Sequence, residues 1–343
     1  MRAPRHIGST MQSVRTYHLP PVHDWDDWRP IFTDSALWRP LIGEIWAADS
    51  TLPAVTGVEM PTRVEAGYPG TCAVFVVNRK VVVKLFPPML PHDLEKERIV
   101  HHLLKRDGLH IPAMLAEGMI QDRRDWPYLI LAYVPGVAWR DCVRGLKIGE
   151  QINMLQALGE IIRAVHGTPL PPAGDWPSLE DWQRLIDTRL PHVADELRQQ
   201  TALSSRIIEE IGQWLSSIDW PAFRPCLCHA DLTEDHLLLS QESGQWQIGG
   251  LIDWADAEVA PPLYEWVTLW FSLCRRQHYL LDAFLAGYDG SLSTEVSAGQ
   301  MLAFTFLHRF GAAMLNEVLS PEEQRAVGNL KELEQQMFPR LPG

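Results

Sequence analysis

The chain has few of the features expected of a nucleic-acid-binding, membrane or disulfide-stabilised protein. Its 30 Lys and Arg residues are outnumbered by 43 Asp and Glu residues, which gives a net charge of −13 and no basic stripe for a nucleic acid. No apolar run approaches the ~20 residues of a membrane-spanning helix, so we expect no membrane partner. Only five cysteines occur among 343 residues, which favours a reducing, cytoplasmic location over a disulfide framework.

The length is sufficient for two lobes with separate cores. Residues 17–55 are rich in Pro and Trp, and we predict that residues 1–55 form an N-terminal extension packed on the small lobe. The basic opening Met1–Arg5 is followed by no signal-like apolar run, so we interpret it as a loose tail. The sequence contains no internal repeat, and it leaves the oligomeric state open.

The strongest chemical signal is the run from His229 to His236, followed by Asp253. Two short apolar segments flank a polar turn between residues 237 and 252, which predicts a hairpin that ends at Asp253. The hairpin would bring together Asp231 on a loop, a metal ligand at His236 and a second carboxylate. In kinase-type sites the first Asp accepts the proton of the attacking hydroxyl, while the other two groups hold Mg²⁺ against the nucleotide phosphates. The pattern therefore indicates an enzyme.

Residues 229–236 resemble the His-x-Asp-x-x-x-x-Asn catalytic loop of the aminoglycoside phosphotransferase and choline kinase family. Ile252-Asp253-Trp254 resembles the metal-binding segment of that family. The resemblance implies an α+β, two-lobed protein-kinase-like fold, with a small β-rich N-lobe and a larger, mainly helical C-lobe. It also implies that Asp231 and His229 are catalytic, that His236 and Asp253 bind Mg²⁺, and that ATP or GTP is the cofactor.

His236 is a departure, because most members of the family have Asn at this position. Mg²⁺ prefers oxygen ligands and imidazole suits softer metals, so the change can alter metal preference. The macrolide phosphotransferase branch resembles this chain in having His there, and we interpret His236 as a variant ligand.

Such a fold requires a phosphate loop, a lysine and a glutamate upstream. Gly67, Gly70 and Thr71 belong to a turn before an apolar hairpin over residues 72–86. Lys84 lies in the second strand of this hairpin, where an unpaired charge would be costly. A helix predicted after Pro91 offers Glu97 as its partner, with Glu95 as the alternative, and the pair would orient Lys84 toward the α- and β-phosphates. A connecting turn and an edge-strand lysine reaching into water are the alternatives.

Residues 127–136 run from a buried strand into a proline-glycine break, similar to the hinge between the lobes of the family. Backbone groups of Ala132 and Val134 would then hydrogen-bond the adenine edge, although an ordinary core strand fits equally well. We predict a nucleotide-binding N-lobe over residues 56–135 and a catalytic and acceptor-binding C-lobe over residues 136–343. In the C-lobe, apolar spacing predicts a helix over residues 152–166 that is capped by Gly167 and ends at a structural His166.

Acidic helices predicted within residues 178–218 correspond to the segment that helps to form the acceptor pocket in the family. An acidic cleft with aromatic walls would suit a cationic, hydroxyl-bearing small molecule, such as an amino-sugar-containing antibiotic, and would suggest a role in antibiotic resistance. Core tryptophans and solvated carboxylates are the alternative. The further residues on which this idea depends are Trp139, Trp176, Trp182, Asp256 and Glu258.

Two more local sequences need interpretation. Ala260-Pro261-Pro262 replaces the Gly-Asp-Pro of the family, and its prolines can start a helix by fixing φ. Cys226, Cys228 and His229 are potential zinc ligands, but a strand alternates its side chains and cannot direct all three at one ion. We therefore predict no zinc site from these three residues.

Three functions from different classes remain. We favour a small-molecule O-kinase. A pseudokinase-like module that binds nucleotide or a partner is the alternative suggested by His236, but intact Asp231, Asp253, Lys84 and Glu97 oppose it. A kinase acting on polypeptides is disfavoured because no Asp-Phe-Gly, Ala-Pro-Glu or His-Arg-Asp signature is present. Aminoglycoside, macrolide, choline-like and amino-acid hydroxyls all stay open as acceptors.

Overall fold

The chain divides into two compact units, which are described separately. The computed structural model describes residues 20–67, 70–87, 89–105, 108–121, 125–170, 182–220, 225–289 and 296–341. Unit 1 comprises Met1–Lys105 and Ile111–Pro135, and unit 2 comprises Arg106–His110 and Gly136–Gly343. No helix in these described ranges is both long and apolar enough to span a membrane.

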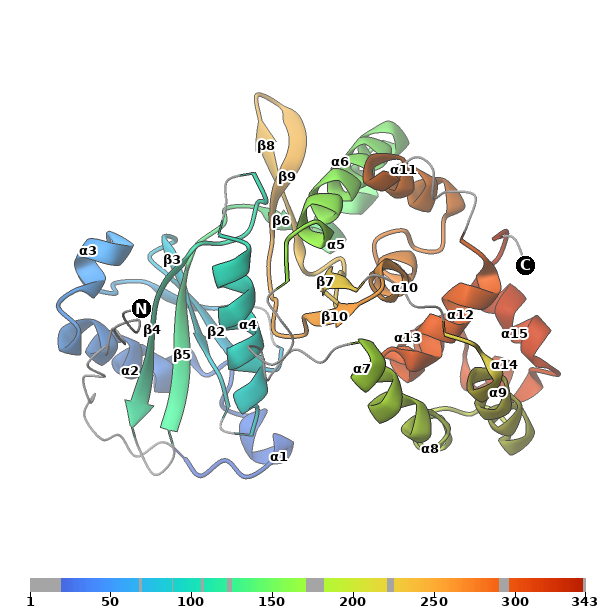
Figure 1. Cartoon of the computed structure of the whole chain (residues 1–343). Helices are drawn as coiled ribbons and strands as arrows, with labels where there is room; N and C mark the ends of the chain where they lie inside the picture. The colour runs from blue at the N-terminus through green and yellow to red at the C-terminus, as the bar shows by residue number, and fades with distance from the viewer. Residues whose placement is uncertain are drawn as a thin grey trace, which may run out of the picture. The chain divides into compact units, whose positions relative to one another are not determined.

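Unit 1 contains a five-stranded antiparallel sheet with the strand order β1-β2-β3-β5-β4, of which Figure 1 labels β2 to β5. Its strands are β1 (Val64–Ala66), β2 (Ala73–Val77), β3 (Val81–Leu85), β4 (Met114–Gln121) and β5 (Asp125–Ala132). The β-branched residues of β2 and β3 favour extended backbone, and alternate residues of β2 are buried. Helix α4 (Pro91–Leu103) begins with a proline in its first turn and packs against β5 and β4.

The N-terminal segment of unit 1 forms three helices: α1 (Trp25–Trp28), α2 (Ser35–Ala48) and α3 (Leu52–Thr56). Trp28 and Trp38 are fully buried, and their rings lie 5.6 and 5.7 Å from the ring of Trp126 on β5. Trp28 Nε1 also donates a hydrogen bond to Thr71 O at 2.8 Å. The segment therefore contributes large aromatic side chains to the core of the sheet instead of lying loosely outside it.

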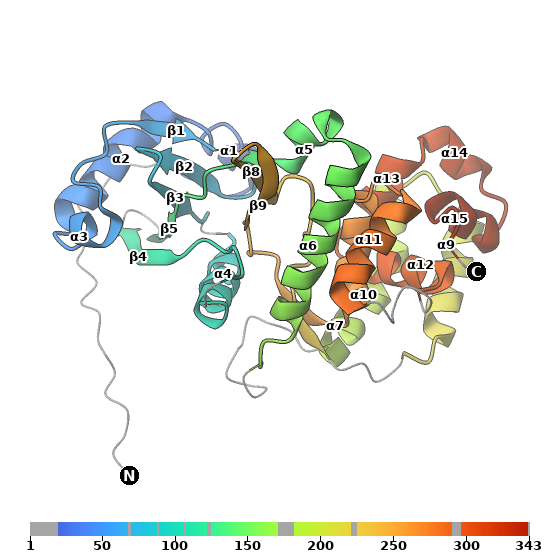
Figure 2. The same cartoon turned by 90° about the horizontal axis from the view of Figure 1, so that it is seen from above.

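Unit 2 is mainly helical. Its first part contains α5 (Trp139–Cys142), the 3-10 helix η1 (Val143–Gly145) and α6 (Ile148–His166), followed by α7 (Trp182–Arg189), η2 (Leu190–His192), α8 (Val193–Gln200) and α9 (Ser205–Ser217). Its last part contains α10 (Pro262–Phe271), α11 (His278–Asp289), α12 (Ala298–Leu307), α13 (Gly311–Val318), α14 (Pro321–Ala326) and α15 (Leu330–Met337). Helices α6 and α11 lie side by side, as Figure 2 shows.

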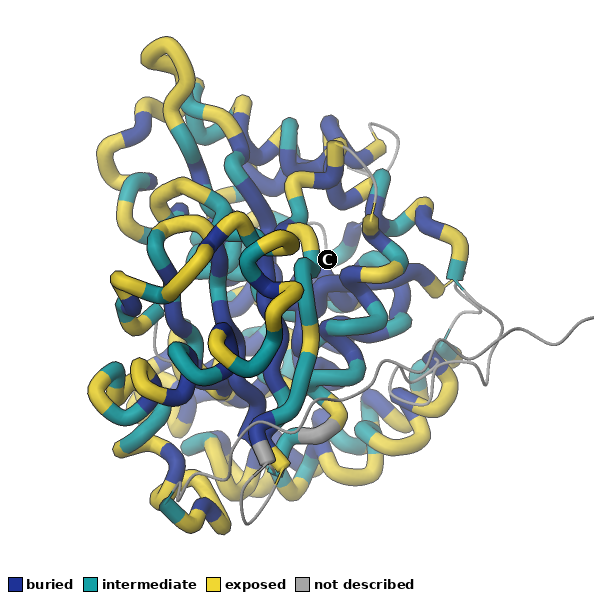
Figure 3. Tube along the Cα trace, turned by 90° about the vertical axis from the view of Figure 1, so that its left-hand side faces the viewer, coloured by how far each residue is buried: buried dark blue, intermediate teal, exposed yellow. Residues whose placement is uncertain are grey.

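Two small sheets in unit 2 carry the loops of interest. Strands β6 (Val137–Ala138), β8 (Leu237–Glu242) and β9 (Gln245–Leu251) form one sheet, and β7 (Cys226–Cys228) pairs with β10 (Glu258–Ala260) in the other. The tip of the β8–β9 hairpin, residues 241–245, is exposed (Figure 3), whereas Leu237 and Leu251 at its base are fully buried. The base of the hairpin is therefore the part that is fixed by the core.

Several elements occur where the sequence predicted them. The predicted hairpins correspond to β2–β3 and β8–β9, and helix α6 ends at His166 with Gly167 as its C-cap. Gly167 has φ −79°, so it ends the helix without the left-handed conformation that usually makes glycine necessary there. Helix α10 begins at Pro262 after an extended Pro261, as expected for prolines that fix φ at a helix start.

Candidate active site

Asp231 lies on the loop that follows β7, and His229 anchors this loop. His229 is fully buried, and burial lowers the pKa of its imidazole, so the neutral form is favoured. Its Nδ1 accepts a hydrogen bond from the Asp231 backbone N–H at 3.3 Å, so Nε2 carries the proton and donates to Ile252 O at 2.9 Å. Because both ring nitrogens bond to backbone groups, the geometry of His229 fits positioning of the loop better than proton transfer.

His236 lies between the two carboxylates of the site. Its Nδ1 is 2.8 Å from the backbone O of Asp231 and 3.4 Å from Asp231 Oδ2, and its Nε2 is 3.7 Å from Asp253 Oδ2. The hydrogen bond to the backbone O requires a proton on Nδ1, which leaves Nε2, on the side of the Asp253 carboxylate, as the ring nitrogen that can coordinate an ion when it carries no proton. An imidazole nitrogen beside a carboxylate can hold a divalent cation, and the imidazole moves the preference of this donor set toward ions softer than Mg²⁺.

Two non-glycine residues of the site have left-handed backbone. Ala230 has φ 60° and Asp253 has φ 64°. For residues with a Cβ this conformation costs on the order of 1 kcal/mol each, and such strain concentrates at functional sites. The conformation reverses the chain directly before Asp231 and at Asp253, which places both carboxylates beside His236.

The surroundings of Asp231 disfavour its ionised form. Burial raises the pKa of its carboxyl from 3.8 to about 7, and the nearby carboxylates of Asp256 and Asp253 act in the same direction. His236 and Arg309 act in the opposite direction, and Arg309 forms an ion pair with Asp256. A carboxyl with a pKa near neutrality is suited to accept a proton.

Glu265 on α10 is a site residue that the sequence analysis did not identify. Its carboxylate has no exposure and accepts hydrogen bonds from the backbone N–H of His229 at 2.6 Å and of Ala230 at 3.1 Å. These two bonds hold the strained backbone just before Asp231. The available signal was a lone carboxylate inside the otherwise apolar run of α10, where an unpaired charge would be costly.

In unit 1, Lys84 on β3 forms an ion pair with Glu97 on α4. Lys84 Nζ lies 2.6 Å from Glu97 Oε2, and the two side chains are only 5% and 1% exposed. His101 Nε2 lies 3.7 Å from the other oxygen of Glu97, and the Lys84 ammonium lies 5.4 Å from the centre of the Phe86 ring. The expected partner of Lys84 is therefore Glu97 and not Glu95, and the pair fixes the direction of a cation in the sheet.

The other predicted nucleotide-binding residues lie at loops and strand ends of unit 1. Gly67 follows β1 and donates its N–H to Val74 O at 2.7 Å, and a Cβ on Gly67 would meet the Val74 side chain at 2.9 Å. Gly70 and Thr71 are exposed, and Tyr68 and Pro69 between them and Gly67 lie outside the described residues. Ala132 ends β5 and donates its N–H to Ala113 O at 2.8 Å, so its carbonyl is the group it can offer to a nucleotide. Val134, half-buried, follows the end of this strand.

The aromatic walls predicted for an acceptor cleft are wrong for two of the three tryptophans. Trp139 is fully buried, and Trp182 is 7% exposed and stacks on Phe304 at 5.4 Å between ring centres. Both are core residues, which was the alternative. Trp176 lies outside the described residues. Glu258, on β10, is also buried. Of the two carboxylates that follow Asp253 in the prediction, Asp256 is the one that raises the pKa of Asp231.

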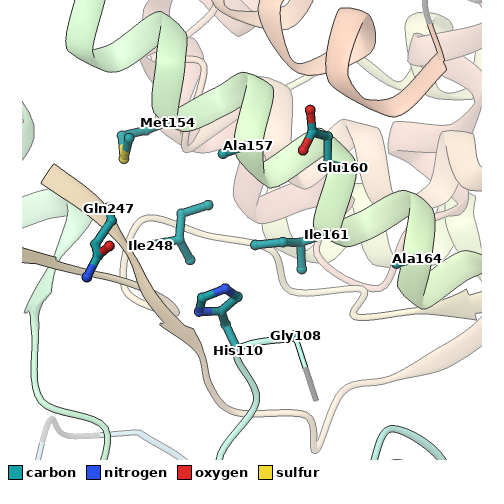
Figure 4. Close-up of a pocket in the computed structure, with 9 residues that line it drawn as sticks. All are labelled: Gly108, His110, Met154, Ala157, Glu160, Ile161, Ala164, Gln247 and Ile248. Carbon is teal, nitrogen blue, oxygen red and sulfur yellow. The ribbon is translucent and has the colours of Figure 1, made fainter. Parts of the chain in front are cut away.

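A pocket in unit 2 lies apart from these residues. It has a volume of about 380 Å³ and lies between α6, β9 and residues 108–110 of the same unit, as Figure 4 shows. None of the predicted catalytic or metal-binding residues lines it, so the pocket does not mark the chemistry. Its lining residues are Gly108, His110, Met154, Ala157, Glu160, Ile161, Ala164, Gln247 and Ile248.

Two curated proteins are similar to part of the chain in sequence. Viomycin phosphotransferase of Streptomyces vinaceus is 22% identical over 165 residues, which are 45% of this chain and 53% of that protein. YcbJ of Bacillus subtilis is 28% identical over 123 residues, 34% of this chain and 37% of that protein, so the matches span about half or less of these curated relatives.

Solved structures of aminoglycoside phosphotransferases are similar in fold. The GDP complex of aminoglycoside 2'-phosphotransferase-IIIa has a TM-score of 0.61 and 18% identity, and the match covers 84% of this chain and 96% of that one. The GDP and kanamycin complex of the same type of enzyme has a TM-score of 0.60 and 17% identity, with 84% and 97% covered. The predicted α+β, protein-kinase-like fold is thereby confirmed. A model of the phosphotransferase enzyme family, APH, matches residues 63–298, which are more than half of the sequence, and the chain therefore belongs to this family.

Proposed function

We propose that the chain transfers the γ-phosphoryl group of ATP or GTP to a hydroxyl group of a small molecule. The observation that carries this proposal is the arrangement of His236 between the carboxylates of Asp231 and Asp253, at 3.4 and 3.7 Å. The related structures are complexes with GDP, ATP or ADP, which supports a purine nucleotide without selecting one.

In the proposed reaction the acceptor oxygen attacks the γ-phosphorus, and the bond from that phosphorus to the oxygen bridging to the β-phosphate breaks. The hydroxyl proton passes to a carboxylate oxygen of Asp231, whose raised pKa of about 7 suits it as the base. Asp253 and His236 would hold Mg²⁺ or Mn²⁺, which supplies charge neutralisation at the phosphates. Lys84, oriented by Glu97, would pair with the α- and β-phosphates.

For the acceptor we propose a hydroxyl on a cationic molecule, with amino-sugar-containing antibiotics as the first class to test. Similar structures contain kanamycin, streptomycin and gentamicin, and the acidic chain would attract such cations. An antibiotic acceptor would make the protein a resistance enzyme. A nucleotide-binding module without catalysis is the second candidate, and the change to His at position 236 is the observation that favours it.

A direct test measures phosphoryl transfer across a library of hydroxylated acceptors, with ATP and GTP in parallel and with Mg²⁺ or Mn²⁺. We expect Asp231→Ala to lower kcat by several orders of magnitude while nucleotide still raises Tm, because the base is lost and the binding groups remain. Asp253→Ala should abolish metal-dependent nucleotide binding, whereas His236→Asn should preserve turnover and favour Mg²⁺ over Mn²⁺.

The two candidate functions give different results in the same assay. Nucleotide binding with no transfer to any acceptor, unchanged by His236→Asn, would support the binding module. Near-normal turnover of Asp231→Ala would remove Asp231 from the mechanism. Glu322→Gln, which changes an exposed carboxylate on α14 outside the predicted acceptor segment, is the control and should leave kcat unchanged.

A further inference from the structure

Three potential metal ligands from distant parts of the sequence converge behind the loop that carries Asp231. Cys226 and Cys228 are alternate residues of β7, so both side chains lie on the same face of this strand. His166 is the last residue of α6, which packs against β7. One ligand atom from each of the three lies within 4.8 Å of the other two. The thiols are buried, and the His166 side chain is 3% exposed.

The spacing of the two sulfur atoms fits a shared ion. The Sγ atoms of Cys226 and Cys228 are 3.8 Å apart, and both thiols are free. A disulfide would require about 2.05 Å. Two thiolates on one tetrahedral zinc ion, each at about 2.3 Å from it, lie about 3.8 Å from each other. A hydrogen-bonded group without an ion, in which Cys226 bonds to Cys228 and to His166, is the alternative that the metal analysis below distinguishes.

His166 is held in the manner of a metal ligand. Its Nδ1 lies 2.9 Å from the hydroxyl of Tyr288, while its Nε2 lies 3.5 Å from Glu265 Oε2. A ligating histidine is usually oriented by a hydrogen bond to its second nitrogen, and Tyr288 provides one. Glu265 borders the histidine but does not belong to the group of residues whose ligand atoms lie within 4.8 Å of one another.

His229 is not part of this cluster, as the alternation of the strand predicted. Its ring nitrogens bond to Asp231 N and Ile252 O. The third ligand is supplied instead by a helix about sixty residues earlier in the chain, which no local spacing reveals.

We propose that His166, Cys226 and Cys228 bind a zinc ion. Because both thiol ligands are buried, we assign the ion a structural role. The ion would join α6 and β7 directly behind the loop that carries Asp231, because Cys228 immediately precedes His229 at the start of this loop. The ion would stabilise the fold and hold this loop in place, so the inference does not depend on the proposed function.

The test is metal analysis of the full-length chain produced in zinc-supplemented medium and purified with reductant. We expect about one zinc ion per chain, and in cobalt-grown protein we expect the absorption band of cobalt bound to thiolate. The double variant Cys226→Ser, Cys228→Ser should lose both signals. Cys142→Ser, which removes a half-buried thiol on α5 outside the cluster, should keep both.

Two outcomes would overturn the site. The first is folded wild-type protein that holds no stoichiometric zinc and shows no thiolate band with cobalt. The second is a double variant that keeps the full metal content, which would place the ion elsewhere on the surface. If the double variant does not fold, the wild-type spectrum decides, because only a thiolate ligand produces the band. His166→Ala then reports the third ligand through a shifted cobalt spectrum.

Discussion

At the scale of single residues, the buried carboxyl of Asp231 shows a conflict between stability and chemistry. Burial and the two neighbouring carboxylates raise its pKa from 3.8 to about 7. Between pH 3.8 and about 7, the carboxyl therefore keeps its proton in the folded protein, whereas in the unfolded chain it has already released it. The cost of ionising it in the fold is absent below about pH 4, grows with pH, and is complete above about pH 7.

Asp231→Asn should therefore stabilise the protein at alkaline pH while it removes the group that we propose as the base. Without nucleotide or metal, we expect the free energy of unfolding at pH 8 to rise by up to about 4 kcal/mol, since one pKa unit corresponds to about 1.4 kcal/mol. The gain should vanish as pH falls to about 4. Urea unfolding across this pH range measures it. Asp187→Asn, at an exposed carboxylate, is the control, and a variant with wild-type stability at every pH would show that Asp231 is not strained by burial.

The Lys84–Glu97 ion pair allows structural and functional roles to be separated. Glu97→Gln leaves a buried ammonium without its carboxylate, and we expect a loss of about 3–5 kcal/mol of stability together with weaker nucleotide binding. The double variant Lys84→Met, Glu97→Leu removes both charges and should regain much of the stability but not the binding. Calorimetric titration with nucleotide and chemical unfolding measure the two effects.

Glu95→Gln is the matched control for this pair, because Glu95 lies on the same helix and is only half-buried. It should leave both quantities close to wild type. A double variant that binds nucleotide normally would mean that Lys84 is a structural cation of the sheet and does not contact phosphate.

At the scale of elements, the close contact of α6 with α11 depends on two glycines. A Cβ on Gly159 would overlap the carbonyl oxygen of Phe284, and one on Gly287 would overlap the carbonyl oxygen of Gln156. Gly149 lies on the same helix as Gly159 but would meet no atom within 4 Å. Gly149 and Gly159 thus lie on the same helix but differ in how closely other atoms pack against them.

Gly159→Ala should lower the free energy of unfolding by about 1–3 kcal/mol or more, because the helices must separate to admit the methyl group. Gly149→Ala should raise it by about 0.5–1 kcal/mol, since alanine is the better helix former. Thermal or urea unfolding of the two variants tests this directly. Equal effects of the two substitutions would show that the close approach of α6 and α11 is not maintained in solution.

The local sequence pattern was sufficient to predict those strands and helices that are marked by apolar periodicity and turn residues. The apolar strands around Lys84, the hairpin that ends near Asp253 and the helix that ends at His166 follow from periodicity and turn residues. Glu265 and the group of His166 with Cys226 and Cys228 could not be predicted in this way, because each joins segments that are far apart in the sequence. The prediction that Trp139 and Trp182 line a cleft was wrong for a related reason, because composition does not distinguish the wall of a cleft from a core.

At the scale of the whole molecule, part of the acidic character proposed for acceptor binding is locally compensated. Glu196 pairs with Arg189 at 2.6 Å, Asp195 with Arg198 at 2.6 Å, and Asp256 with Arg309. The net charge of −13 is not removed by these pairs. The protein should therefore attract a cationic acceptor through its overall field more than through any single acidic residue of these helices.

This distinction predicts how salt affects turnover. With an amino-bearing acceptor, kcat/KM should fall as ionic strength rises, because screening at about 0.15 M shortens the reach of the field to roughly 8 Å. The N-acetylated form of the same acceptor has no positive charge at that nitrogen and should show little dependence on salt, which makes it the matched control. Removal of one carboxylate, as in Asp195→Asn, should change kcat/KM by less than about twofold, because exposed pairs contribute little. If only neutral or anionic alcohols are phosphorylated, and salt has no effect on them, a cationic acceptor is excluded.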